Sequence, residues 1–198
     1  MSDEQASDEA ADYGRVGYGG YARWSPLALA VVMIVAVAWI ALHRPDKHVL
    51  TRDLIGKPAP ALTFTMNDGR QVPLDSLRGQ VVVLNFWASW CEPCVREMPA
   101  FQAIAADQRA GVQIIGVNLK NDQDDAAAAL LASTGVTYSI TKDSGGSGIF
   151  QGTIEEAFGS PGQYPMTIVI APDGTVDSAH VGELTGDQIR KAIDRAGS

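Results

Sequence analysis

Two cysteines separated by Glu92 and Pro93 are the residues whose types and spacing most directly predict chemistry. Cys91 and Cys94 are the only cysteines among the 198 residues of the chain. A thiolate can attack a disulfide, and a second thiol nearby can then attack the mixed disulfide and release the substrate. The pair therefore predicts a redox-active dithiol. A disulfide-stapled scaffold would need more cysteines, spread along the chain.

The elements expected around the pair assign a role to each thiol. Val81–Trp87 is a nearly continuous apolar run, as in a buried central strand, and residues 93–109 carry apolar residues at helical spacing. Cys91 is thus expected at a helix N-terminus, where unpaired N–H groups and the helix dipole lower the pKa of a thiol. Cys94 lies one turn further in and is expected to be more buried. These positions predict that Cys91 attacks and that Cys94 resolves the mixed disulfide.

Other kinds of site find little support in the sequence. The three histidines, His43, His48 and His180, are scattered, whereas a zinc site would need two further Cys or His ligands beside the cysteine pair. We therefore expect no metal and no cofactor other than a redox-active Cys91–Cys94 disulfide. The net charge is −8 and no stripe of Lys and Arg occurs, so a nucleic-acid partner is not expected.

The first part of the chain divides by composition into three segments. Residues 1–23 are polar, acidic at first and then rich in Gly and Tyr, which predicts a disordered tail. Residues 24–42 are apolar without a polar face, a run at the short end of the roughly 17–25 residues that a bilayer needs, and are predicted to be a transmembrane anchor. A signal peptide cleaved near Ala36–Ala38 is the alternative. Residues 43–56 are expected to be a linker and residues 57–198 the folded domain.

Hydrophobic periodicity and turn residues predict the remaining elements of the folded domain. They give an α/β fold with a central mixed sheet and helices on both faces. The expected elements are a hairpin (Leu62–Met66 and Arg70–Leu74, around an Asp-Gly turn), a strand (Val112–Val117), a helix (Asp122–Thr134, followed by Gly135), a second hairpin (Met166–Ala171 and Thr175–Val181) and a last helix capped by Thr185.

The run Trp90-Cys91-Glu92-Pro93-Cys94, with Glu97 and Pro99 after it, resembles the TlpA/ResA-type reductases of the thioredoxin superfamily. The opening Gly56–Pro60, the segment Leu77–Gly79 and the run Tyr164–Thr167 are similar as well, so that the resemblance covers residues 54–196. It implies a thioredoxin-like sheet flanked by helices, with an added N-terminal hairpin. It also implies reduction of protein disulfides outside the cytoplasm, with apocytochrome c before haem attachment as one substrate.

The resemblance also implies roles for individual residues. Pro165 matches the cis-proline that lies against the two cysteines in this family. Asn85 stands where thioredoxins carry a buried Asp, and a neutral amide is no general base. Glu97, on the same helical face as Cys94, is the candidate replacement because partial burial would raise its pKa. The alternative is an ordinary glutamate of the first turns of the helix.

Four further residues are expected to contact the substrate or tune the pair. Glu92 and Pro93 lie between the cysteines, and Glu92 is expected to be exposed and to adjust the redox potential. Trp90 is expected to help hold the partner protein. Tyr164 and Met166 flank Pro165, and both depart from the small or β-branched residues typical of the family. Tyr164 is expected to contact the substrate.

The resemblance and the apolar segment together predict a single-pass protein of the cell inner membrane, with its domain on the periplasmic side. A reductase there needs electrons from a membrane thiol-electron donor. The Lys and Arg residues flanking residues 24–42 are nearly balanced and lean slightly against this orientation. Three alternatives stay open at this point: a general disulfide oxidase, a peroxiredoxin-like antioxidant and a copper-handling thiol module.

Overall fold

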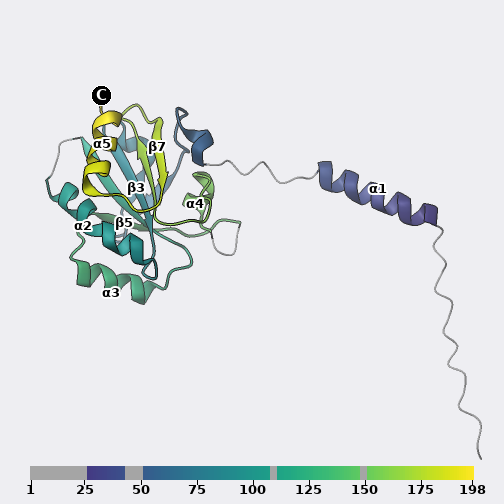
Figure 1. Ribbon diagram of the computed structural model, residues 1–198, viewed down its shortest axis with the longest axis horizontal. Coiled ribbons are helices and arrows are strands. Elements are labelled where there is room, and N and C mark those ends of the chain that lie inside the picture. The colour runs from purple at the N-terminus through teal and green to yellow at the C-terminus, as the bar shows by residue number, and fades with distance from the viewer. Residues whose placement is uncertain (1–25, 43–50, 108–110, 148–150) are drawn as a thin grey trace, which may run out of the picture. The chain divides into compact units, whose positions relative to one another are not determined.

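The computed structural model describes residues 26–42, 51–107, 111–147 and 151–198 (Figure 1). The predicted tail, residues 1–23, and most of the predicted linker lie outside the described residues. Contacts divide the chain into two units, residues 1–47 and residues 48–198. Each unit is described by itself.

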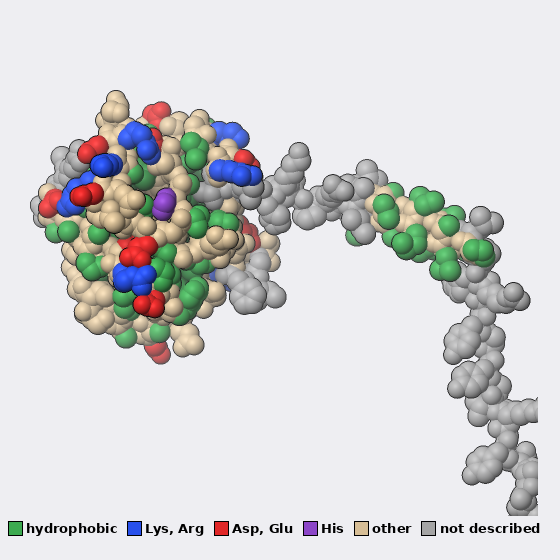
Figure 2. All heavy atoms as spheres, viewed as in Figure 1, with side chains coloured by type: hydrophobic (Ala, Val, Ile, Leu, Met, Phe, Trp, Pro, Cys, Tyr) green, Lys and Arg blue, Asp and Glu red, His purple; other side chains and the backbone are tan. Residues whose placement is uncertain are grey.

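Helix α1 (Pro26–Leu42) is the described part of the first unit. It contains no charged residue, and Figure 2 shows apolar side chains around it. Apolar residues such as Leu29, Ile34 and Trp39 are more than half exposed. The helix spans 17 residues, and within the described residues none is both long and apolar enough to cross a membrane. A helix thus forms over residues 26–42 of the segment predicted at 24–42, whose first two residues lie outside the described residues, but the prediction that it crosses a membrane is not met.

A five-stranded mixed sheet forms the centre of the second unit, as predicted. The strand order is β5-β4-β3-β6-β7. Strand β3 pairs in parallel with β4, and β4 with β5, whereas β6 runs antiparallel to both β3 and β7. The strands are β3 (Val81–Trp87), β4 (Val112–Asn118), β5 (Ser139–Lys142), β6 (Met166–Ile170) and β7 (Val176–Val181).

Strand β3 is central because all of its side chains except that of Asn85 are apolar, on both faces. All seven of its residues are buried, which fits a strand that is covered on both sides. Neighbouring side chains of a strand point to opposite faces. Asn85 bonds to Glu97 of helix α2, whereas the ring of Phe86 packs edge-on against Phe158 after helix α4. Helical segments therefore cover both faces of β3, as predicted.

In the described part of the second unit, four α-helices accompany the sheet, and two of their ends have the caps that the sequence predicts. Thr185 caps the last helix by accepting the N–H of Gln188, as its sequence position predicts. Gly135 ends α3 with a positive φ of 67°, a conformation that favours glycine. The helices are α2 (Glu92–Ala106), α3 (Asp124–Thr134), α4 (Thr153–Ala157) and α5 (Gly186–Ala196).

The predicted first hairpin consists of β1 (Thr63–Thr65) and β2 (Gln71–Pro73), which pair antiparallel. Residues 51–56, which the sequence assigned to the linker, include a 3₁₀ turn at Thr51–Leu54 and pair with β7, where the N–H of Gly56 donates to Val176. Residues 51–56 therefore belong to the folded second unit, ahead of the expected start of the domain at residue 57. Strand β5 and helix α4 were not predicted from the sequence.

Candidate active site

Cys91 and Cys94 form a disulfide, with an S–S distance of 1.99 Å and their Cα atoms 5.3 Å apart. Cys91 is the N-cap residue of α2, and Pro93 stands in the first turn, where a missing N–H leaves no hydrogen bond unmade. Cys91 is 5% exposed and Cys94 is fully buried. The structure therefore places Cys91 at the helix N-terminus and Cys94 deeper, as predicted.

The loop between β3 and Cys91 is fixed by the carboxylate of Asp122, which is 6% exposed. Asp122 accepts the backbone N–H of Ser89 at 2.7 Å and the Ser89 hydroxyl at 2.5 Å. It also accepts the side-chain amide of Asn118 at 2.7 Å. Lys142 donates to Asn118 Oδ1 and to the carbonyl of Asp122. Residues from β4, β5 and the loop before α3 thus hold the approach to Cys91.

The Tyr164–Pro165 peptide bond is cis, as the resemblance implied. It lies directly before β6, and Met166 pairs with Phe86 near the end of β3, so this loop lies beside the strand that leads to the cysteines. The carbonyl of Pro165 accepts the N–H of Gly182 at 2.8 Å, which anchors the loop to the end of β7.

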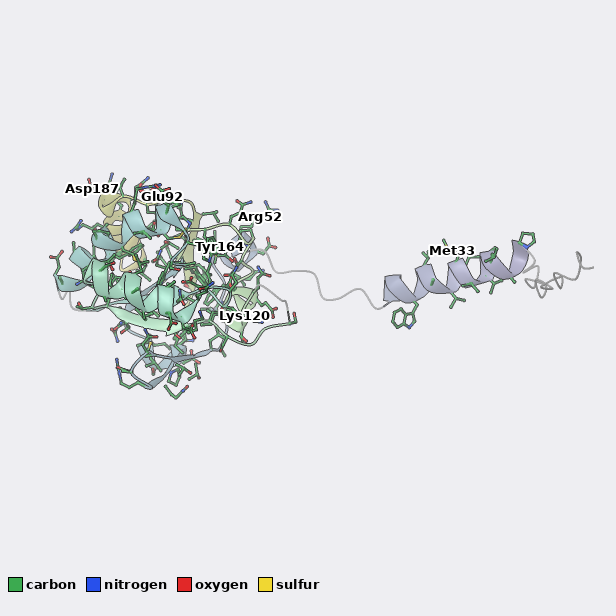
Figure 3. The ribbon with its side chains drawn as sticks, turned by 90° about the horizontal axis from the view of Figure 1, so that it is seen from below. Met33, Arg52, Glu92, Lys120, Tyr164 and Asp187 are labelled. Carbon is green, nitrogen blue, oxygen red and sulfur yellow. A yellow bond between two sulfur atoms is a disulfide. The ribbon has the colours of Figure 1, made fainter. Side chains whose placement is uncertain are left out.

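Two aromatic rings connect the proline loop with the cysteine loop. Trp90 and Tyr164 meet edge to face, with ring centroids 6.4 Å apart and planes at 78°. Trp90 is 56% exposed and Tyr164 is half-buried. Figure 3 labels Tyr164 within the body of the domain and Glu92 near its rim. Because Trp90 directly precedes Cys91 in the chain, the two rings form an aromatic surface next to the cysteine loop.

Glu97 is a buried carboxylate on α2, only 2% exposed. Its Oε1 accepts the side-chain amide of Asn85 at 2.6 Å, and its Oε2 accepts the N–H of Leu184 at 3.1 Å. Burial raises its pKa from 4.5 to about 7, because it disfavours the charged form more than the two hydrogen bonds favour it. Glu97 is therefore not an ordinary surface glutamate, and a proton can leave or join it near neutral pH.

Glu92 is exposed, as predicted, and forms an ion pair with Arg96 at 3.0 Å. Arg96 also pairs with Glu183 at 2.7 Å, and Glu183 is the neighbour of Leu184. The guanidinium of Arg96 lowers the pKa of Glu183 through a hydrogen bond. On the face that Figure 2 shows, acidic and basic side chains lie interspersed. Arg96 therefore connects Glu92, between the cysteines, with Glu183, whose neighbour Leu184 donates its N–H to Glu97.

The structure thus brings together the predicted residues of one site. Their contributions to catalysis stay predictions. Sequence reasoning missed several residues that position them, because their partners are distant in the chain and no motif marks them. These are Ser89, Asn118, Asp122, Asp143, Glu155 and Leu184.

Comparisons with known proteins agree with this geometry. Residues 55–179 match the model of the AhpC/TSA family. The thiol:disulfide interchange protein HelX of Rhodobacter capsulatus is 33% identical over 170 residues, covering 84% of this chain and 90% of that protein. The thiol-disulfide oxidoreductase ResA of Bacillus anthracis is 32% identical over 138 residues, covering 68% of this chain and 74% of that protein.

Solved structures give the same picture of the fold. The crystal structure of a putative thiol:disulfide interchange protein DsbE from Chlorobium tepidum superposes with a TM-score of 0.60. It is 29% identical and covers 70% of this chain and 94% of that chain. The similarity thus spans most of the second unit, which carries both cysteines.

Proposed function

Because the chain belongs to the AhpC/TSA family, and within it to the TlpA/ResA-type thiol-disulfide oxidoreductases, we propose that it reduces protein disulfides outside the cytoplasm. The observation that carries the proposal is a cysteine pair at the N-terminus of α2, beside a cis-proline loop and above a buried carboxylate. A dithiol in this place can be both reactive and selective.

The proposed cycle starts from the reduced pair. The Cys91 thiolate attacks one sulfur of the substrate disulfide, and the other substrate sulfur leaves as a thiolate and takes up a proton. The Cys94 thiolate then attacks Cys91, which releases the second substrate thiol and forms the Cys91–Cys94 disulfide. Two electrons pass from the enzyme to the substrate. The N–H groups and dipole at the start of α2 favour the Cys91 thiolate throughout.

Cys94 needs a proton acceptor, because a buried thiol has a raised pKa. Glu97 is proposed for this role, since it lies on the same helical face and its pKa of about 7 suits a base at neutral pH. Asn85 and Leu184 hold the carboxylate by donating one hydrogen bond to each oxygen.

The residues around the cysteines are proposed to recognise the substrate. Trp90 and Tyr164 offer apolar surface for a substrate side chain. Pro93 and Glu92 lie between the cysteines, where a charge affects the potential of the pair.

Substrate, donor and location follow from the same proposal. Apocytochrome c is the proposed substrate, and a membrane thiol-electron donor is proposed to reduce the enzyme again. The exposed apolar side chains of α1 support attachment to the cell inner membrane, with the domain on the periplasmic side. A reporter fused after Ser198 that is active only in the cytoplasm would contradict this placement.

The test of the reaction uses the full chain with insulin and with a Cys-x-x-Cys-His peptide disulfide. Cys91→Ser is expected to abolish reduction, and Cys94→Ser to trap a mixed disulfide that a gel without reductant reveals. Activity retained in Cys91→Ser would refute the mechanism. The redox potential of the pair decides direction: a value well below that of glutathione supports a reductase, and a high value supports an oxidase.

A further inference from the structure

Glu155 is a fully buried carboxylate that the proposed reaction does not use. It lies on α4, where its Oε1 accepts the hydroxyl proton of Tyr164 and its Oε2 accepts the N–H of Gly152 at 3.3 Å. A second buried carboxylate, Asp143, accepts the N–H groups of Ile154 and Glu155, both at 2.9 Å. Two carboxylates are thus buried around a helix of five residues.

Burial of a carboxylate costs free energy unless hydrogen bonds compensate for it. An apolar side chain would fill the position of Glu155 without that cost. Besides its local bond to the Gly152 N–H, Glu155 adds a hydrogen bond to a residue of the active-site loop. Its own place is fixed, because Phe158 at the end of α4 is fully buried and packs edge-on against Phe86 of β3.

Tyr164 is the residue that this hydrogen bond holds. It forms the cis peptide with Pro165, and its ring meets Trp90, the residue before Cys91, edge to face. The hydrogen bond to Glu155 restrains the Tyr164 ring at its hydroxyl end, which also accepts the Ser160 hydroxyl at 3.5 Å. These contacts favour one arrangement of the two rings, and Trp90 is next to Cys91 in the chain.

We infer that Glu155 is a positioning residue for substrate recognition: it holds Tyr164 against Trp90, and the aromatic pair selects disulfides that have an aromatic or large aliphatic side chain next to the cysteine. The inference rests on the proposed function and names the substrate class of that site. A preformed aromatic surface binds such a side chain with less ordering cost than a mobile one. A single aromatic contact corresponds to roughly a tenfold preference or less.

The experiment measures kcat and KM of the full, reduced chain with two peptide disulfides that differ only in having Phe or Ser beside the attacked cysteine. The unmodified protein is expected to prefer the Phe peptide by about five- to tenfold, mainly through KM. Glu155→Ala should bring that ratio close to one. Glu155→Gln should keep it, because its amide oxygen still accepts the Tyr164 hydroxyl.

Two further variants complete the design. Tyr164→Phe should lose the preference as Glu155→Ala does, and the double variant should lose no more than either single one. Glu156→Ala is the matched control on α4, since that carboxylate accepts from Ser147 and not from Tyr164. It should leave the ratio unchanged.

The outcomes separate this inference from the proposed function. Equal turnover of both peptides by the unmodified protein overturns the inference and leaves the reductase intact, whereas turnover of neither peptide overturns both. A preference that survives Tyr164→Phe overturns the positioning role, and this variant decides the matter if Glu155→Ala fails to fold.

Discussion

Glu97→Gln should remove a pH dependence of stability that comes from one buried carboxylate. Burial raises the pKa of Glu97 from 4.5 to about 7 in the folded chain, whereas the unfolded chain exposes the group to water. Between these two values the folded state holds a proton that the unfolded state has lost. The free energy of unfolding therefore falls as pH rises through this window.

The magnitude follows from the size of the pKa shift. One pKa unit corresponds to about 1.4 kcal/mol, so the shift of Glu97 makes the folded state roughly 3 kcal/mol less stable above pH 7 than below pH 4.5. The higher free energy of unfolding that comes with a protonated Glu97 is fully present below pH 4.5 and is lost as pH rises past 7. The variant carries no titrating group at this position. The side-chain NH2 group of the new glutamine faces the N–H donor of either Asn85 or Leu184. This loses one hydrogen bond and lowers the free energy of unfolding by about 1–3 kcal/mol at every pH.

The assay is urea denaturation of the oxidised chain and of its Glu97→Gln variant at several pH values from 4 to 8. The difference between their free energies of unfolding cancels the titration of other carboxylates. That difference should move by about 3 kcal/mol in favour of the variant as pH rises. A difference that stays constant over this range would show that Glu97 titrates like an exposed glutamate, and the proposed base would lose its support.

Two other substitutions test the surroundings of the site. Asp122→Ala should lower the free energy of unfolding by about 2–4 kcal/mol and speed hydrogen exchange at the Ser89 amide, because the buried Asn118 amide and the partly buried Ser89 donors lose their acceptor; an unchanged exchange rate would contradict the role of Asp122. Gly152→Ala should destabilise by more than about 2 kcal/mol, since its Cβ would lie 2.2 Å from Asp143 Cγ. Gly186→Ala, whose nearest atom is at 3.3 Å, is the control and should change stability by less than about 1 kcal/mol. Equal effects of the two glycine variants in urea denaturation would refute the steric argument.

The sequence predicted the parts of the fold whose signals are local. Val81–Trp87 is apolar at every position but one, so its central place could be inferred from composition alone. Thr185 and Gly135 mark helix ends by capping chemistry that involves only neighbouring residues. The position of Cys91 at the start of α2 follows from the same local logic, because a strand and a short loop precede the helix and Pro93 stands in its first turn.

Contacts between distant segments could not be predicted in this way. Strand β5 is short, with two of its four residues buried, and its partner β4 decides that it forms a strand. Helix α4 has five residues and begins where Asp143 accepts its N–H groups. Asp122 was expected only at the start of a helix, yet its carboxylate reaches Ser89, 33 positions earlier. Such partners become visible only when the sheet has brought the segments together.

Asn85 stands where thioredoxins carry a buried Asp, and the buried carboxylate of this site is instead that of Glu97. An amide at position 85 suits a carboxylate at position 97. A carboxylate at position 85 would lie within hydrogen-bond distance of Glu97, whose Oε1 is 2.6 Å from the Asn85 amide nitrogen. Two buried carboxylates at that distance cannot both ionise, so one pKa would rise far above neutrality. The amide instead donates a hydrogen bond, which lowers the pKa of Glu97 against the effect of burial. The balance near pH 7 therefore needs both residues, a neutral donor on β3 and a single carboxylate on α2.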